Sequence, residues 1–202
     1  NVYSRGLERE YRTNFFPFYL APVADTLRGA PLMSSIPFYM LLGNHDVPAS
    51  DLDKEPGGLA YFYYNDLPVN APITKLRVEA TGRPERFKAF EKNTESRFPA
   101  MSNFSFDYGN VHITCLDSNP YANPLDRDLL LWLINDLKTS KADWKIVAYH
   151  HPAFNTSISH YDDQQMRLIA PILEEQKVDL VLAGHVHNYQ RSFPLKFELK
   201  LD

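Results

Sequence analysis

Cysteine is almost missing from this chain, because Cys115 is the only one among its 202 residues. The chain can therefore form no internal disulfide, and it has no thiolate cluster of the kind that builds a closed structural zinc site. We interpret Cys115 as a small core residue. Any metal site in this sequence has to be built from imidazole nitrogens and oxygen ligands.

Long apolar runs and excess positive charge are also missing. No run of about 18 or more apolar residues occurs, so we expect no membrane span. The 21 Lys and Arg residues are outnumbered by 25 Asp and Glu residues, which gives a formal charge of −4. A general nucleic-acid-binding surface needs a basic face, so we expect no such partner. The hydrophobic share of 44% is that of a globular protein with a core.

What the sequence does contain is a series of short apolar runs separated by loops, which indicates an α/β domain. Residues 36–42, 144–149 and 178–183 are expected to be buried strands. Residues 104–108 and 111–116 alternate between apolar and polar side chains on either side of a Gly-Asn pair. This pattern predicts a β-hairpin.

Two helices are expected between these strands. The first opens at Asn123-Pro124, and the second starts at Asp162 or Asp163. Their apolar faces repeat at helical spacing: Leu125, Leu129, Trp132, Leu133 and Leu137 in the first, and Met166, Ile169, Ala170 and Leu173 in the second. Alternation of strand and helix predicts parallel pairing through crossover helices.

Residues 48–102 are different, because they are rich in Pro, Gly, Asn and charged residues. We interpret them as a loop-rich excursion with a helix near residues 85–90. Loops of this length are usually functional or disordered, and our hypothesis is a lid on the substrate side. The whole chain, residues 1–202, is expected to form a single domain.

Three polar loops follow the three expected buried strands. They read Gly-Asn-His-Asp at residues 43–46, His-His-Pro at 150–152 and Gly-His-Val-His at 184–187, and they hold five of the seven histidines. In open α/β sheets, ligands bind outside the carboxyl ends of the strands. We therefore expect these loops to form one site.

Each histidine taken alone is more often a surface or hydrogen-bonding residue than a ligand, but their joint placement favours metal binding by His150, His185 and His187. His185 and His187 either face one ion or straddle two. Asn44 offers an amide oxygen, which is reasonable beside a bridged pair of metals. His45 is placed to donate a proton or to hold an anion. We assign His112, inside a strand, a structural role.

The three motifs in this order resemble the calcineurin-like metallophosphoesterase family, over residues 36–191. The continuation Asn-Tyr-Gln-Arg at residues 188–191 is similar to its purple acid phosphatase branch, whose last motif reads G-H-x-H-x-Y-x-R. The resemblance implies a β-sandwich of two mixed sheets flanked by helices. It also implies two metal ions, about 3.5 Å apart, drawn from iron, zinc and manganese.

The resemblance also assigns roles to individual residues. Asn44, His150 and His185 would hold the second, divalent metal, and His187 would bind the first. His45 would contact the phosphate. His160, ten residues beyond His150, lies where plant members of the branch carry another substrate histidine.

The family's mechanism would follow from these roles. A metal-bound hydroxide would attack phosphorus in line, and a histidine would protonate the leaving alkoxide.

The sequence departs from the family at its first two motifs, D-x-G and G-D-x-x-Y, which supply a terminal Asp, the bridging Asp and a Tyr. No Gly-Asp pair occurs in the chain. Asp107-Tyr108-Gly109 spells the first motif, but it follows residues 43–46 and is better explained as the turn of the hairpin. We therefore expect a metallophosphoesterase domain incomplete at both ends, and we expect this chain to hold at most one metal ion well.

Three functions remain open at this point. The first is an acid phosphatase acting on phosphate monoesters. The second is a phosphodiesterase of the same family, and the third is a non-catalytic domain that binds metal or phosphate. The resemblance tilts towards a secreted or periplasmic protein, and nothing in the sequence indicates an oligomeric state.

Overall fold

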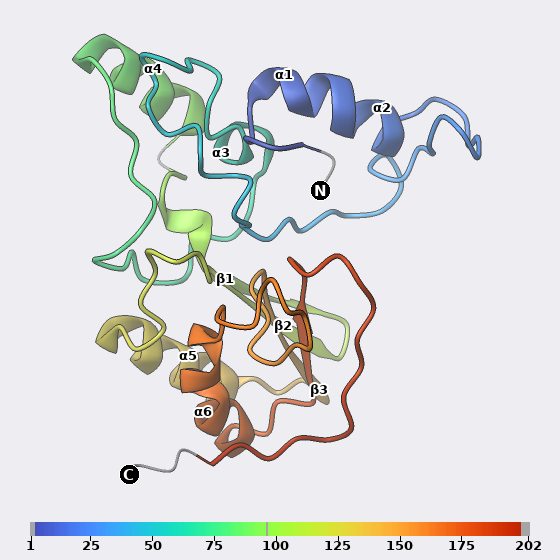
Figure 1. Ribbon diagram of the computed structural model, residues 1–202, viewed down its shortest axis with the longest axis vertical. Coiled ribbons are helices and arrows are strands. Elements are labelled where there is room, and N and C mark those ends of the chain that lie inside the picture. The colour runs from blue at the N-terminus through green and yellow to red at the C-terminus, as the bar shows by residue number, and fades with distance from the viewer. Residues whose placement is uncertain (1–2, 96, 199–202) are drawn as a thin grey trace. The chain divides into compact units, whose positions relative to one another are not determined.

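The computed structural model of the chain describes residues 3–95 and 97–198 (Figure 1). These residues form two compact units. The first contains the residues up to Met40 with Asn44–Leu67 and Val78–Pro99, and the second contains Leu41–Gly43, Pro68–Arg77 and the residues from Ala100 onward. The motif at residues 43–46 is thus divided, with Gly43 in the second unit and the rest in the first.

A mixed sheet forms the centre of the second unit. Its strands are β1 (Phe104–Tyr108), β2 (Val111–Leu116), β3 (Trp144–Tyr149) and β4 (Leu180–Ala183), in the spatial order β1-β2-β3-β4. β1 and β2 pair antiparallel, which confirms the predicted hairpin, and Gly109 in its turn has a φ of +60°. The other two pairs are parallel.

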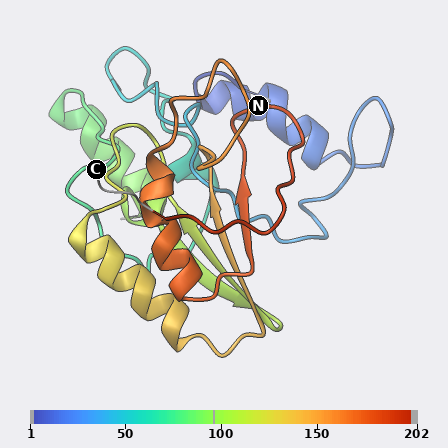
Figure 2. The same cartoon turned by 60° about the horizontal axis from the view of Figure 1, so that its bottom comes forward.

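Helices flank this sheet, and the predicted α/β class is confirmed. α5 (Arg127–Thr139), η3 (the 3₁₀ helix Gln165–Ile169) and α6 (Ala170–Glu175) lie on one face of the sheet (Figure 2). The described residues contain this one sheet, and a second sheet of the expected sandwich is not found among them.

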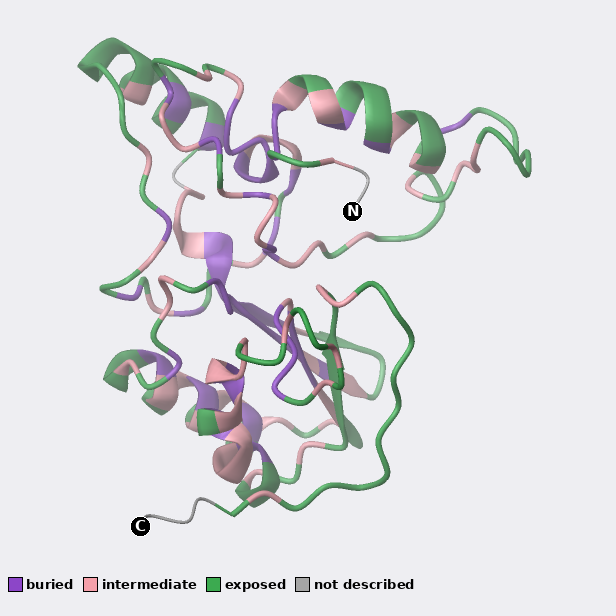
Figure 3. Ribbon diagram, viewed as in Figure 1, coloured by how far each residue is buried: buried purple, intermediate pink, exposed green. Residues whose placement is uncertain are grey.

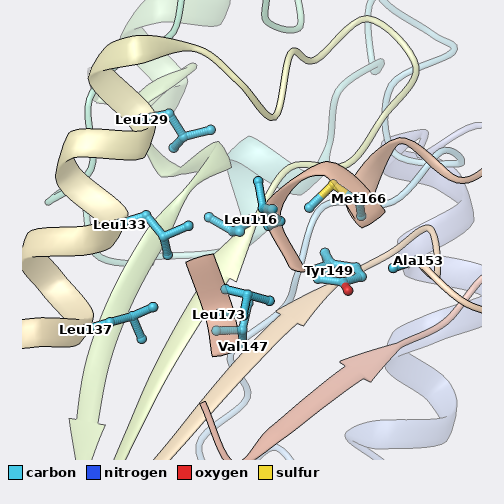
Figure 4. Close-up of a cluster of buried hydrophobic side chains, with 10 residues drawn as sticks. Leu116, Leu129, Leu133, Leu137, Val147, Tyr149, Ala153, Met166 and Leu173 are labelled. Carbon is cyan, nitrogen blue, oxygen red and sulfur yellow. The ribbon is translucent and has the colours of Figure 1, made fainter. Parts of the chain in front are cut away.

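The core of the second unit lies between these helices and β2 and β3 (Figure 4). α5 has a buried inner stripe and an exposed outer one (Figure 3). The fully packed side chains are Leu116, Leu129, Leu133, Leu137, Val147, Tyr149, Ala153, Met166, Ile169 and Leu173. The helical faces predicted from spacing are thus largely confirmed, although Leu125 is exposed and Trp132 and Ala170 are only partly buried.

The starts of both helices differ from the prediction. α5 begins after Asp126, whose carboxylate accepts hydrogen bonds from the backbone N–H groups of Asp128 and Leu129, both at 3.1 Å. The side chain of Asn123 accepts from the N–H of Leu125, at 3.0 Å, and so closes a turn before the helix. Asp126 is the N-cap because its carboxylate satisfies two backbone N–H groups that have no partner within the helix. The second helical segment begins at Gln165 as a 3₁₀ turn.

Two of the predicted strands are wrong in part or in whole. β4 covers only Leu180–Ala183, and it is exposed rather than buried, with Leu180 at 47% and Leu182 at 49%. It lies at the end of the strand order, so it has a single neighbour within the described sheet.

Residues 36–42 form no strand, although Leu42 is fully buried. Pro37 lacks the N–H that a ladder requires, and the carbonyl of Met40 accepts from the hydroxyl of Tyr61 at 2.9 Å. An apolar run predicts that its residues are buried, but buried residues need not pair with a neighbouring strand.

The first unit is helical and aromatic. α1 (Glu8–Glu10), η1 (the π-helix Tyr11–Phe15) and α2 (Phe16–Tyr19) follow one another directly, and α3 (Tyr61–Tyr64) and α4 (Pro84–Thr94) come later. Tyr11, Phe15 and Ala60 are the buried centre of an apolar cluster. α4 confirms the helix expected near residues 85–90, whereas the helical segment from residue 8 to 19 was not predicted.

The remaining helix is η2 (Ala100–Ser102), a short 3₁₀ turn before β1 in the second unit. No helix of the described residues has the length and apolar character needed to cross a membrane. The interpretation of residues 48–102 as a lid within a single domain stays a prediction.

Candidate metal site

The register of the sheet brings three loops to one edge. Leu116 of β2 pairs with Tyr149 of β3, and Tyr149 pairs with Ala183 of β4, so the three parallel strands end at the same level. The segments that follow are residues 117–119, 150–152 and 184–187. The loops at residues 150–152 and 184–187 therefore lie at one edge, as predicted, and the loop after β2 joins them.

His150 and His185 face each other across this edge. Nε2 of His150 lies 3.2 Å from Nδ1 of His185. The backbone of two glycines lies close to the His150 ring. A Cβ on Gly43 would lie 3.0 Å from Nδ1 of His150, and a Cβ on Gly184 would lie 3.3 Å from the same atom. The first and third sequence motifs thus each contribute a glycine that lets the backbone approach this imidazole closely.

The loop after β4 has an unusual backbone. His185 has a φ of +66° and His187 a φ of +57°, in the left-handed region that residues other than glycine rarely adopt. Such conformations cluster at functional sites because the surrounding fold has to enforce them. The side chain of His187 is exposed, and it joins neither of the groups of potential metal ligands found among the described residues.

His151 completes the first of these groups, with His150 and His185. Its ring centroid lies 4.4 Å from that of His185. Burial, together with the charge of His185, lowers the pKa of His151 to about 4, so the ring is neutral at physiological pH. Ser118 after β2 anchors it, because Ser118 Oγ lies 3.1 Å from its Nδ1 and accepts from its backbone N–H at 2.8 Å.

His160 and Asp163 form a second group with His185. Nε2 of His185 lies 3.0 Å from Nδ1 of His160 and 3.3 Å from Oδ2 of Asp163. Burial lowers the pKa of His185, the charge of His160 also lowers it, and Asp163 opposes both. The predicted site residues His150, His160 and His185 are thus brought together.

Ser118, His151 and Asp163 were not predicted as ligands or substrate residues, although His151 lies in one of the predicted loops and Asp163 was a candidate helix start. The only signals that could have indicated them are the place of Ser118 after a strand, the adjacency of His151 to His150 and the spacing of Asp163 from His160.

Asn44, His45 and Asp46 are placed in the first unit. Nδ1 of His45 donates to the carbonyl oxygen of Ser4 at 2.6 Å, which orients the ring. The buried carboxylate of Asp46 accepts from the hydroxyls of Tyr3 at 2.7 Å and Tyr11 at 3.3 Å. Burial raises the pKa of both tyrosines, and the charge of Asp46 raises it further. The roles of Asn44 and His45 stay predictions.

The donor set fits a metal of the zinc, iron or manganese type. In each group the potential ligand atoms lie within 4.8 Å of one another. The first group consists of imidazole nitrogens alone, and the second adds the carboxylate oxygen of Asp163. No disulfide or thiolate competes, because Cys115 is buried and reduced.

Comparison with known proteins agrees with this chemistry. The family model described as calcineurin-like phosphoesterase matches residues 2–189. Three relatives are similar to the chain: purple acid phosphatase 23 of Arabidopsis thaliana, 30% identical over 80% of this chain and 30% of that protein; an acid phosphatase of Aspergillus ficuum, 26% identical over 79% and 34%; and a probable inactive purple acid phosphatase 9 of Arabidopsis thaliana, 25% identical over 80% and 25%.

The chain thus spans between a quarter and about a third of the length of these three relatives. The matched residues include all three histidine-bearing motifs. The resemblance inferred from those motifs, with its purple acid phosphatase branch, is confirmed. This chain belongs to the calcineurin-like phosphoesterase family.

Proposed function

We propose that the protein to which this chain belongs hydrolyses phosphate monoesters with the help of two bound metal ions, as an acid phosphatase. The observation that supports this most directly is the pair of ring nitrogens, His150 Nε2 and His185 Nδ1, held 3.2 Å apart at the carboxyl edge of the sheet. In a member of the phosphoesterase family, such a pair of nitrogens is suited to coordinate one divalent ion.

The proposed ligands are Asn44, His150 and His185 for one ion and His187 for the other. When bound, the ions would act as Lewis acids on the phosphate oxygens and make water acidic enough to serve as a nucleophile. Iron, zinc and manganese all suit these donors.

His45 and His160 act on the substrate in this proposal. The Nδ1 proton of His45 is held by the carbonyl of Ser4, so its Nε2 is the nitrogen presented to a phosphate oxygen or to the leaving group. His160 is only partly exposed and lies beside the ligand His185, where it can donate to a phosphate oxygen.

A monoester substrate is favoured over a diester by the continuation Asn-Tyr-Gln-Arg at residues 188–191, which is similar to the purple acid phosphatase motif. The test compares p-nitrophenyl phosphate with bis(p-nitrophenyl) phosphate as substrates of the longer protein. We expect a higher kcat/KM for the monoester. A clear preference for the diester would identify a phosphodiesterase instead.

The variant His45→Ala tests catalysis itself. Loss of a positioned proton donor should lower kcat on the order of 10²-fold or more, and the metal content should not change. Metal analysis by plasma mass spectrometry and steady-state kinetics on the longer protein provide the two measurements. His150→Ala is the matched control, because removal of a proposed ligand should lower metal content and turnover together.

A non-catalytic binding domain is the second candidate. One observation favours it: one of the relatives of this chain bears the name of a probable inactive purple acid phosphatase. Under this alternative the longer protein binds metal or phosphate but shows no turnover that His45→Ala could reduce.

A further inference from the structure

Residues 4–7 lie against the motif that carries His45. The carbonyl oxygen of Ser4 accepts from Nδ1 of His45 at 2.6 Å. Gly6 has a φ of +63°, and a Cβ at this position would lie 2.8 Å from Cα of Asp46 and 2.8 Å from the carbonyl oxygen of His45. The segment therefore packs with its backbone directly on the His45–Asp46 peptide, an approach that a side chain on Gly6 would prevent. All of these residues belong to the first unit.

The side chain of Glu10, in α1, holds this segment. Its Oε1 accepts from the N–H of Ser4 at 3.2 Å. Its Oε2 accepts from the N–H groups of Arg5 at 3.1 Å and Leu7 at 3.0 Å. One carboxylate thus binds three N–H groups within four consecutive residues. Hydrogen bonds to an ionised acceptor are stronger than those between neutral groups.

The charge of Glu10 suits this arrangement. Burial works to raise the pKa of Glu10, but the hydrogen bonds from the three backbone N–H groups outweigh it, and the net effect is a lowered pKa. An ionised carboxylate offers acceptor sites only, which matches a set of three donors. An amide in the same place would present a donor group to one of these N–H groups.

The helix that carries Glu10 is anchored within the same unit. α1 runs directly into η1, whose Tyr11 is buried. The N–H of Glu8 donates to the carbonyl of Gly57 at 2.7 Å. A side chain on a fixed helix can hold a loop in one position. Glu10 therefore connects this helix to the carbonyl group that binds His45.

We propose that Glu10 is a positioning residue for His45. It fixes the carbonyl of Ser4, this carbonyl accepts from Nδ1 of His45, and the ring is thereby held with Nε2 as the nitrogen that acts on the substrate. The inference rests on the proposed function, in which His45 contacts the phosphate or the leaving group. It extends that function to a residue outside the three histidine-bearing motifs.

Steady-state kinetics of the longer protein test the proposal through a double-mutant cycle. Glu10→Gln keeps the size of the side chain but replaces one acceptor oxygen with a donor group. It should lower kcat roughly tenfold and leave KM within about twofold, with unchanged metal content. In the His45→Ala background the same substitution should change kcat by less than about twofold, because the residue through which Glu10 acts is gone.

Glu8→Gln is the matched control. It removes a carboxylate from the same helix, but the partners of Glu8 are Arg12 and Tyr64 rather than residues 4–7, so kcat should stay within about twofold of the parent value. If Glu10→Gln lowers kcat by the same factor with and without His45, its role is only structural and the proposal is wrong. An unchanged kcat in a protein whose turnover depends on His45 also overturns the proposal, and the proposed function then stands.

A measurement without turnover separates this proposal from the proposed function. In the 202-residue chain labelled with ¹⁵N-histidine, NMR at about pH 8.5, above the ordinary range of histidine pKa values, shows which ring nitrogen of His45 carries the proton. We expect the Nδ1–H tautomer in the parent chain and in Glu8→Gln. Glu10→Gln should increase the share of the Nε2–H tautomer.

A second variant protects this measurement against misfolding. Glu10→Asp keeps the charge but shortens the side chain by one methylene, so its carboxylate cannot reach all three N–H groups and the tautomer of His45 should shift in the same direction. Far-UV circular dichroism checks that each variant is folded. If His45 has the same tautomer in the parent chain and in the folded Glu10 variants, the proposal is wrong, whether or not the longer protein hydrolyses phosphate esters.

Discussion

His112 illustrates what a single residue does in the second unit. Its Nδ1 lies 2.7 Å from Oδ1 of Asp107 on β1, and its Nε2 lies 2.9 Å from Oδ2 of Asp136 on α5. Asp136 also accepts from Ser105 Oγ at 2.7 Å and from Thr114 Oγ1 at 3.0 Å. The imidazole thus links the hairpin to the helix that covers it, in agreement with the structural role assigned from the sequence.

The two partners of this link have displaced pKa values. The hydrogen bond with Asp136 raises the pKa of His112, burial opposes this, and Asp107 adds to the increase. Burial works to raise the pKa of Asp136, but hydrogen bonds from His112 and Ser105 outweigh it, and the net effect is a lowered pKa. Protonated His112 and ionised Asp136 are therefore both stabilised by folding.

The sign of the resulting pH dependence follows by linkage. The contribution of His112 is complete below its unfolded pKa, near 6.5, and is lost as the pH rises through its higher folded value. The contribution of Asp136 is complete above its unfolded pKa, near 3.9, and is lost as the pH falls through its lower folded value. We therefore predict that His112→Gln lowers the free energy of unfolding by roughly 1–3 kcal/mol between about pH 4 and 6.5, and by less at pH 9.

Urea denaturation at several pH values measures this difference. The exposed His187 supplies a matched control, because His187→Gln should leave the free energy of unfolding nearly unchanged at every pH. If the destabilisation caused by His112→Gln increased towards alkaline pH, the interaction between protonated His112 and ionised Asp136 would be contradicted. The sequence could place His112 in a strand, but it could not pair it with Asp136, which lies 24 residues away on another element.

At the scale of elements, the cap of α5 allows a direct test of the corrected helix start. Asp126→Ala removes the acceptor of two backbone N–H groups, and we expect it to lower the free energy of unfolding by about 1 kcal/mol. Asn123→Ala should cost less, because the Asn123 side chain accepts one hydrogen bond and lies outside the helix. Thermal and urea unfolding of the two variants measure the difference. Equal destabilisation by both would mean that the helix starts at Asn123 in solution.

The elements that the sequence predicted well are those whose signal is local. The hairpin β1-β2 has a turn pair between two alternating runs, and α5 has an apolar stripe at helical spacing. The failures lie where pairing depends on distant residues. Residues 36–42 and 178–183 are both largely apolar, yet the first segment forms no strand and the second forms a short, exposed strand at the end of the described sheet. Hydrophobicity alone does not specify which neighbour a strand will have.

At the scale of the whole molecule, the candidate site also combines residues that a sequence pattern could place with residues that depend on distant parts of the chain. His150 and His185 could be predicted as neighbours, because both follow parallel strands whose carboxyl ends meet at one edge. Asp163 could not, since a loop and not a strand carries it to His185. The position of His187 relative to a metal ion could not be predicted either. It depends on the left-handed backbone of His185 and of His187 itself, which the sequence does not indicate.

The number of metal ions bound is a property of the chain as a whole. Two cations about 3.5 Å apart repel each other strongly unless carboxylates bridge them, and the chain has no Gly-Asp pair to supply the bridge of the family. We therefore expect the 202-residue chain to retain at most one metal ion and to hydrolyse p-nitrophenyl phosphate poorly.

Plasma mass spectrometry on protein purified without chelator counts the ions, and a p-nitrophenol assay on the same sample measures turnover. Under the proposed function, the longer protein is the control, and it should hold two ions and hydrolyse the ester faster than the isolated chain. Two ions per isolated chain, together with robust hydrolysis, would contradict the expectation. The bridging carboxylate would then have to come from a second chain or from a residue outside the family's motifs, and Asp163 would be the first such residue to replace.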